Sequence, residues 1–189
     1  EVDDLLSPLL EHMRAVSGVQ RIEVAGSYRR RCETIGDIDL LALASDPVEV
    51  SEGLVGFSGV DRVLGSGLTK TSVVLRSGLQ VDLRVVPADS WGAALTYFTG
   101  SKEHNIKLRQ RALERQLRMS EYGVFKIPDE SLSDTIGERG LASEGKMVAG
   151  DSEESVYEAL GLPWFPPEMR EDRGELAVAE ADQLPNLIE

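Results

Sequence analysis

The stretch GDIDLLALA, residues 36–44, places two aspartates, Asp37 and Asp39, at the start of an apolar run. Short apolar runs of this kind favour a buried β-strand. Side chains two residues apart in a strand share a face, so both carboxylates should project from one face while Ile38 and Leu40 pack into the core behind. Buried carboxylates need a partner, and Mg²⁺ or Mn²⁺ suits two adjacent ones. Two solvated aspartates at a strand edge are the alternative.

A third acid stands in a similar setting. Asp82 is an isolated carboxylate in the β-branched run QVDLRVV, residues 80–86. If its strand neighbours the strand that carries Asp39, the three acids form a cluster able to hold two divalent metals. The competing interpretation is an edge-strand acid paired with Arg84 or facing solvent.

The segment AGSYRRR, residues 25–31, lies just upstream of the aspartates. Gly26 allows a backbone to approach a phosphate closely, Ser27 offers a hydroxyl, and the arginines that follow offer forked donors. A solvated basic turn would explain the arginines equally well when they are taken alone. An anion site beside a metal site is what a nucleoside triphosphate requires, and this adjacency favours such a ligand.

Composition narrows the class of protein. The chain has 189 residues and one cysteine, Cys32, which excludes an internal disulfide and fits a reducing, cytoplasmic compartment. No run reaches the roughly 20 apolar residues of a membrane span. The net charge of −13 argues against a polyanionic partner, but residues 100–126 carry 7 basic and 3 acidic side chains. Without an initiator Met, we expect a piece of a longer protein.

The periodicity predicts an α+β fold in two parts. In residues 1–88 we expect a mixed or antiparallel sheet with helices, including a hairpin formed by KTSVVL and LQVDLRVV around Ser77 and Gly78. In residues 89–189 the pattern predicts a helix ending at Gly100, a long helix over 102–119, a strand at 121–127, loops or small hairpins over 128–150 and a capped helix near Ser152. The tail from 176 onward has little to pack.

The motifs together resemble a known family. GSYRRR, GDIDLL, VDLRVV and YFTGS, read in that order, resemble the family X DNA polymerases, relatives of DNA polymerase beta, and the ending GLPWFPPEMREDRGE is similar to their bacterial branch. The first two motifs also occur more broadly among nucleotidyltransferases. The resemblance implies a nucleotidyltransferase palm over residues 1–88 and a thumb, also called fingers, over residues 89–189.

The resemblance also implies site residues and ligands. Asp37, Asp39 and Asp82 would be the catalytic ligands of two divalent cations, Mg²⁺ or Mn²⁺. A second group would bind the incoming dNTP: Ser27, Arg30, Gly36, Tyr97, Phe98, Thr99, Gly100 and Asn105. Thr69, Lys70 and Arg109 would contact primer-template or gapped DNA. Departures from the family pattern stand at Ile35, Gln80 and Lys102.

The expected function is that of a monomeric DNA-directed DNA polymerase core, adding a dNMP to a primer 3′-OH in gap-filling DNA repair. We expect the parent's amino-terminal lyase or DNA-binding domains to be absent, and its nuclease too, because only His12 and His104 are available for a histidine-rich metal cluster. One alternative is a template-independent nucleotidyltransferase. Others are a nucleotide- or DNA-binding module with little turnover, or an inactive scaffold.

Overall fold

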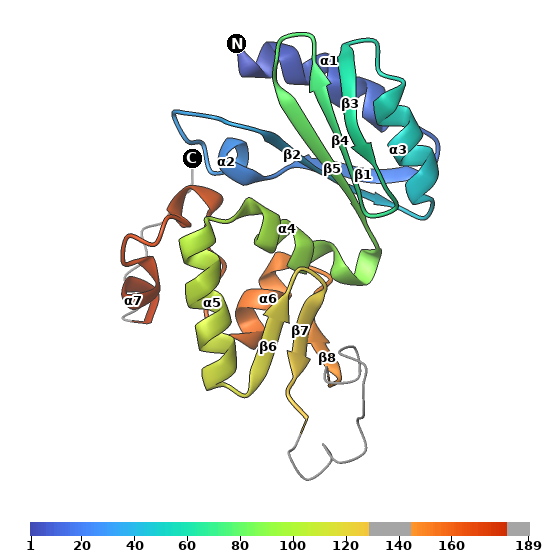
Figure 1. Cartoon of the computed structure of the whole chain (residues 1–189). Helices are drawn as coiled ribbons and strands as arrows, with labels where there is room; N and C mark the ends of the chain where they lie inside the picture. The colour runs from blue at the N-terminus through green and yellow to red at the C-terminus, as the bar shows by residue number, and fades with distance from the viewer. Residues whose placement is uncertain (129–144, 181–189) are drawn as a thin grey trace. The chain divides into compact units, whose positions relative to one another are not determined.

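The computed structural model describes residues 1–128 and 145–180, and the chain divides into two compact units, Glu1–Ala88 and Asp89–Glu189 (Figure 1). The fold is α+β, as the sequence predicts. In the described part of the chain, no helix combines the length and apolar character that crossing a membrane demands.

The first unit is a five-stranded mixed sheet with helices packed on one face. Its elements are α1 (Val2–Arg14), β1 (Val19–Val24), α2 (Gly26–Arg29), β2 (Ile38–Ala44), α3 (Pro47–Val55), β3 (Val60–Ser66), β4 (Lys70–Leu75) and β5 (Gln80–Val86). The strand order is β1-β2-β5-β4-β3. Only β2 and β5 pair in parallel; β4 and β5 form the predicted antiparallel hairpin.

Residue alternation decides which face of this sheet is covered. Val81 and Leu83 of β5 are buried in a core shared with Leu9 of α1 and Leu54 of α3. The alternate residues of β5 therefore point to the face that these two helices leave uncovered. Local chemistry fixes α3 in place: Asp46 caps it by accepting from two backbone N–H groups, and Pro47 starts its first turn.

The second unit packs helices against a small antiparallel sheet. Its elements are η1 (Ala88–Ser90), α4 (Trp91–Thr99), α5 (Lys102–Glu114), β6 (Leu117–Ser120), β7 (Gly123–Lys126), β8 (Met147–Ala149), α6 (Glu153–Ala159), η3 (Pro167–Met169) and α7 (Glu175–Glu180). The strand order is β6-β7-β8. The Ser152 and Ser155 side chains form a reciprocal capping box on α6.

Two expectations for this unit are wrong. The helix predicted over 102–119 ends at Glu114, because Gln116 takes a left-handed φ of 59° and Leu117 begins β6, which pairs with β7. The tail is packed at its start: Leu176 and Ala179 of α7 lie against the apolar core. Most of the loops or small hairpins expected over 128–150, and residues 181–189 of the tail, lie outside the described residues.

A buried ion pair ties the second unit together. The fully buried Arg170 guanidinium donates to Glu153 Oε2 at 2.7 Å and to the Phe165 carbonyl oxygen at 2.9 and 2.7 Å. Glu153 also accepts from Thr96 Oγ1 at 3.1 Å and from Trp164 Nε1 at 3.2 Å. Both charges are hydrogen-bonded on several sides, which is the condition under which a buried pair is tolerated.

A second buried chain of polar groups contains His104. Its Nδ1 lies 2.8 Å from Glu175 Oε1 and its Nε2 lies 3.0 Å from the Tyr157 hydroxyl. Burial lowers the pKa of His104, and Glu175 also has a lowered pKa, because hydrogen bonds from His104 and backbone N–H groups outweigh its own burial. An ionised carboxylate only accepts, so the neutral ring donates from Nδ1 and accepts the Tyr157 O–H at Nε2.

Candidate active site

Two of the three expected carboxylates meet on neighbouring strands. Strands β2 and β5 run parallel, and Asp39 stands opposite Asp82 in the register. Both side chains lie on the face that α1 and α3 leave uncovered, because their neighbours Leu40 and Leu83 enter the core. Asp37 is exposed and precedes the first residue of β2. The sheet topology thus brings acids from distant parts of the chain to one place.

Asp39 is held by an arginine. Arg84 Nη1 lies 3.4 Å from Asp39 Oδ1, and both side chains are half-buried. The pKa of Asp39 is raised, chiefly by burial; Arg84 opposes this shift, and the nearby Asp82 and Asp37 charges add to it. The sequence suggested Arg84 as a partner of Asp82. It pairs with Asp39 instead, because the parallel register sets β5 beside β2.

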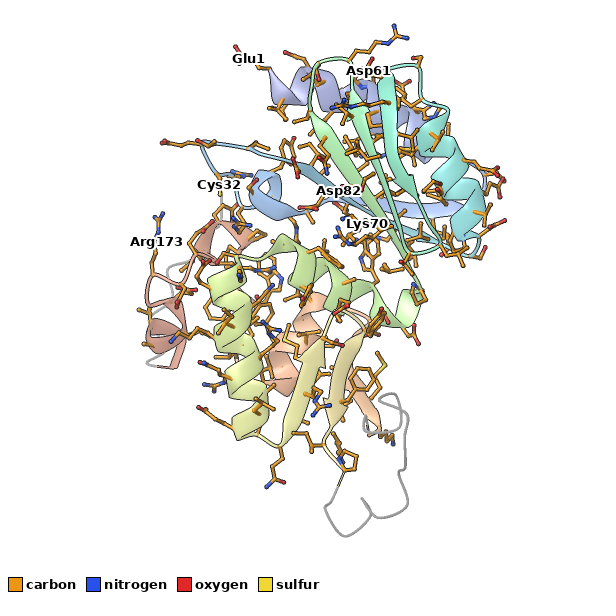
Figure 2. The ribbon with its side chains drawn as sticks, in the orientation of Figure 1. Glu1, Cys32, Asp61, Lys70, Asp82 and Arg173 are labelled. Carbon is orange, nitrogen blue, oxygen red and sulfur yellow. The ribbon has the colours of Figure 1, made fainter. Side chains whose placement is uncertain are left out.

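Asp82 is more deeply set, with 7 % of its surface exposed. Its Oδ1 accepts from Ser72 Oγ at 2.6 Å and from Gln80 Nε2 at 3.1 Å. Ser72 belongs to β4 and stands directly opposite Asp82. Figure 2 marks Asp82 together with Lys70, which begins β4 opposite Arg84. Asp82 therefore accepts hydrogen bonds from two neutral side chains, whereas the partner of Asp39 is a charged guanidinium.

Gly26 brings the chain close to Asp39. Its φ is +64°, and a Cβ atom added there would lie 2.5 Å from Asp39 Oδ2. A side chain is thus disfavoured by the backbone conformation and blocked by the carboxylate. The Ala25 N–H also donates to the Asp39 carbonyl oxygen at 2.8 Å. The backbone that precedes Ser27 is therefore fixed against the start of β2.

The expected phosphate-binding residues follow Gly26. Ser27 lies in the short helix α2, Arg30 caps its carboxyl end, and both are half-buried. The Cys32 N–H donates to the Ser27 carbonyl oxygen at 3.0 Å, which closes the turn. Gly36 is exposed immediately before Asp37. Hydroxyl, guanidinium and open backbone thus lie along one short segment that leads into the carboxylates.

The other expected nucleotide contacts gather within the second unit. Tyr97 and Phe98 are half-buried near the end of α4, with ring centroids 5.1 Å apart, and the buried Thr99 and Gly100 follow them. Asn105 Nδ2 donates to the Tyr97 carbonyl oxygen at 2.7 Å. Among the described residues, its buried Oδ1 has no hydrogen-bond partner. A buried atom of this kind usually has a partner in protein, water or a ligand.

The expected DNA contacts are all exposed. Thr69 and Lys70 lie at the turn between β3 and β4, and Arg109 lies on α5. The exposed face of α5 also carries Lys107 and Leu113. A mixed apolar and basic surface of this kind is available to a polyanion.

The three acids are suitable ligands for divalent cations, but their side chains do not form a preorganised metal site. Within residues 1–128 and 145–180, no three His, Cys, Asp or Glu side chains converge closely enough to hold a metal ion. Arg84 lies beside Asp39, and Asp37 is exposed before β2. Carboxylate oxygens are nevertheless the ligands that Mg²⁺ and Mn²⁺ prefer, so the donor set fits.

Sequence reasoning missed Ser72 and misplaced the partner of Arg84. Gln80, Asp82 and Arg84 lie two residues apart on β5 and share a face. The partners across the sheet depend on strand order and register, which alternation does not reveal. A serine in an otherwise β-branched run was the available signal.

Known proteins resemble both units. The family model described as DNA polymerase beta thumb matches residues 94–171. A DNA polymerase/3′-5′ exonuclease PolX of Bacillus subtilis is 38% identical over 88% of this chain, and DNA polymerase lambda of Arabidopsis thaliana is 29% identical over 90%. The chain spans 27% and 35% of these two relatives' lengths.

A solved structure agrees with these relatives. The ternary gap complex of Leishmania infantum polymerase beta superposes with a TM-score of 0.72 at 26% identity, over 88% of this chain and 70% of that one. The mixed sheet with paired acids is thus the palm type of fold found in nucleotidyl-transferring enzymes. The chain belongs to the family X DNA polymerases, relatives of DNA polymerase beta.

Proposed function

We propose that this chain is the core of a DNA-directed DNA polymerase that adds a dNMP to a primer 3′-OH, with gap-filling repair as its setting. The observation that carries the proposal is the register of Asp39 and Asp82 on neighbouring parallel strands, with Gly26 closed against Asp39. The first unit would act as the palm and the second as the thumb.

Asp37, Asp39 and Asp82 would hold two divalent cations. When bound, the cations would supply Lewis-acid chemistry and neutralise phosphate charge. The chain's own part is positioning: Asp82 would lie beside the primer 3′-OH, while Asp37 and Asp39 would lie toward the triphosphate. The Arg84 contact to Asp39 is long and half-exposed, so it is exchangeable when a stronger charge arrives.

Two groups of residues would contact the incoming nucleotide. Ser27, Arg30 and the backbone at Gly36 would bind the β- and γ-phosphates, since a hydroxyl, a guanidinium and open N–H groups are phosphate ligands. Tyr97, Phe98, Thr99 and Gly100 would line the sugar. The amide of Asn105 would contact the base, because its Oδ1 and second Nδ2 hydrogen remain available.

DNA would be bound through its backbone and minor groove. Thr69 and Lys70 would contact primer or template phosphates, and Arg109 would contact the template strand. These contacts predict affinity that falls steeply with salt, because each neutralised phosphate releases counterions. The net charge of −13 makes weak binding by this chain alone the expectation.

Primer extension tests the proposal. A gapped or recessed duplex would be offered with each dNTP singly in Mg²⁺ or Mn²⁺, with Asp82→Asn as the test variant. Asp61→Asn is the matched control, because Asp61 is exposed on β3 (Figure 2). Incorporation should follow the template base, fall at least about 10³-fold in Asp82→Asn and persist in Asp61→Asn.

Other results would redirect the proposal. Addition that ignores the template base would assign a template-independent nucleotidyltransferase. Metal-dependent dNTP binding without addition on any substrate would assign a nucleotide-binding module. Extension by Asp82→Asn at the wild-type rate would contradict the role of Asp82.

A further inference from the structure

We propose that Ser72 is a positioning residue for Asp82: its hydroxyl holds one carboxylate oxygen so that the other is presented for metal binding. The inference rests on the proposed function, because it assigns a role at the same site. It adds a residue from β4 to a set of acids drawn from β2 and β5.

Three side chains stand in a row across three strands. Asp39 of β2 is opposite Asp82 of β5, and Asp82 is opposite Ser72 of β4. All three lie on the face that α1 and α3 do not cover. Asp82 is thus flanked by a carboxylate on one side and by a hydroxyl on the other. Of these two neighbours, only the Ser72 hydroxyl can donate a hydrogen bond to the Asp82 carboxylate.

The hydrogen bonds to Asp82 select one oxygen. Ser72 Oγ at 2.6 Å and Gln80 Nε2 at 3.1 Å both donate to Oδ1, so neither occupies Oδ2. A carboxylate on a strand otherwise turns about its terminal torsion, which is broad. With Oδ1 bound from the β4 side, Oδ2 is left for another ligand, and Asp39 of β2 is the acid opposite Asp82. Partners that orient a metal-binding side chain in this way typically change metal affinity or activity 10- to 100-fold.

Thr71, which precedes Ser72 on β4, also has a hydroxyl, but its contacts are different. Thr71 is buried on the opposite face, where its Oγ1 lies 2.5 Å from Ser51 Oγ of α3. Thr71 therefore secures a helix to the sheet, whereas Ser72 contacts an acid of the candidate site. A purely structural role for Ser72 would make Ser72→Ala resemble Thr71→Val, with lowered stability and unchanged metal binding.

The test compares four forms of the 189-residue chain: wild type, Ser72→Ala, Ser72→Thr and Ser77→Ala. Ser77→Ala is the matched control, since Ser77 lies in the turn between β4 and β5 and its hydroxyl oxygen accepts from the nearby Leu79 N–H at 3.4 Å. Mn²⁺ affinity would be measured from free Mn²⁺ by electron paramagnetic resonance. Single-turnover primer extension would give the maximal rate and the dNTP dependence, and thermal unfolding would confirm folding.

Ser72→Ala should weaken Mn²⁺ binding about tenfold or more and lower the maximal rate by a similar factor. Its apparent dNTP affinity should stay within about twofold, because the phosphate ligands are elsewhere. Ser72→Thr should restore both values to within about threefold of wild type, and Ser77→Ala should match wild type.

The outcomes separate the two proposals. Equal Mn²⁺ affinity and rate in Ser72→Ala and wild type would overturn the role of Ser72 while leaving the polymerase intact. The wild-type chain could also extend no primer while Ser72→Ala weakens Mn²⁺ binding and Ser72→Thr restores it. That result would keep the positioning role of Ser72 and overturn the polymerase proposal. A wild-type chain that neither binds Mn²⁺ nor extends primers would overturn both.

Discussion

The two units handle buried charge in opposite ways. In the second unit, Arg170 is fully buried and its guanidinium makes three hydrogen bonds of 2.9 Å or less. In the first unit, Arg84 meets Asp39 at 3.4 Å with both side chains half-buried. The Arg170–Glu153 pair has all its partners without a ligand, whereas the charges of Arg84 and Asp39 remain exchangeable. The comparison separates a scaffold from a site by the quality of its ion pairs.

The largest expected effect tests the scaffold. Arg170→Met leaves Glu153 buried without its cation, so we expect a loss of about 3–5 kcal/mol in the free energy of unfolding. Both tryptophans, Trp91 and Trp164, belong to the second unit, so fluorescence during urea unfolding reports that unit. Asp82→Asn, a change in the candidate site, should leave this transition in place. Equal transitions in Arg170→Met and wild type would contradict the scaffold assignment.

The next effect tests the closeness of Gly26 to Asp39. Gly26→Ala combines a left-handed backbone with a Cβ atom 2.5 Å from Asp39 Oδ2, so we expect a stability cost of about 1–3 kcal/mol together with loss of Mn²⁺ binding and primer extension. Gly78→Ala is the matched control, because Gly78 has a φ of +90° with open space around it. It should show the backbone cost with metal binding retained. Loss of metal binding in both variants would show that the contact between residue 26 and Asp39 is not the cause of the loss.

A third prediction concerns pH and the second unit alone. His104 and Glu175 both have lowered pKa values, so the unfolded chain binds more protons than the folded one as pH falls. The stability that they contribute is full above the ordinary His pKa of 6.5 and declines below it, first through His104 and then, below 4.5, through Glu175. Tryptophan-monitored unfolding between pH 7.5 and 5.5 measures the first part.

His104→Gln supplies the control for that measurement. His104 is the second unit's one histidine in the sequence, so its replacement should flatten the pH dependence between 7.5 and 5.5. An unchanged slope in this variant would show that another group is responsible.

The smallest expected effect tests the site. Arg84→Gln removes the cation beside Asp39, so Mn²⁺ should bind somewhat more tightly, by at most about fivefold, since exposed pairs contribute roughly 0.2–1 kcal/mol. Electron paramagnetic resonance of free Mn²⁺ measures this change. Weaker binding in Arg84→Gln would mean that the arginine supports the site instead of competing for Asp39.

The sequence predicted local features well and spatial partners poorly. The sequence located β2, β4 and β5 through their apolar and β-branched runs. It left open whether the strands of Asp39 and Asp82 are neighbours, because strand order depends on packing of the whole sheet. The end of α5 was missed because Arg115 and Gln116 carry no Gly or Pro signal. The networks around His104 and Arg170 join residues far apart in the chain, which no periodicity encodes.

The parallel pairing of β2 with β5 also bears on how the chain folds. Asp39 and Asp82 are 43 residues apart in the chain, and α3, β3 and β4 lie between them. The β3–β4 and β4–β5 hairpins close short loops, whereas joining β2 to β5 closes a long one at a greater entropic cost. The acid pair therefore forms only when this non-local contact forms. A partly folded chain can contain both hairpins and still lack the pairing of Asp39 with Asp82.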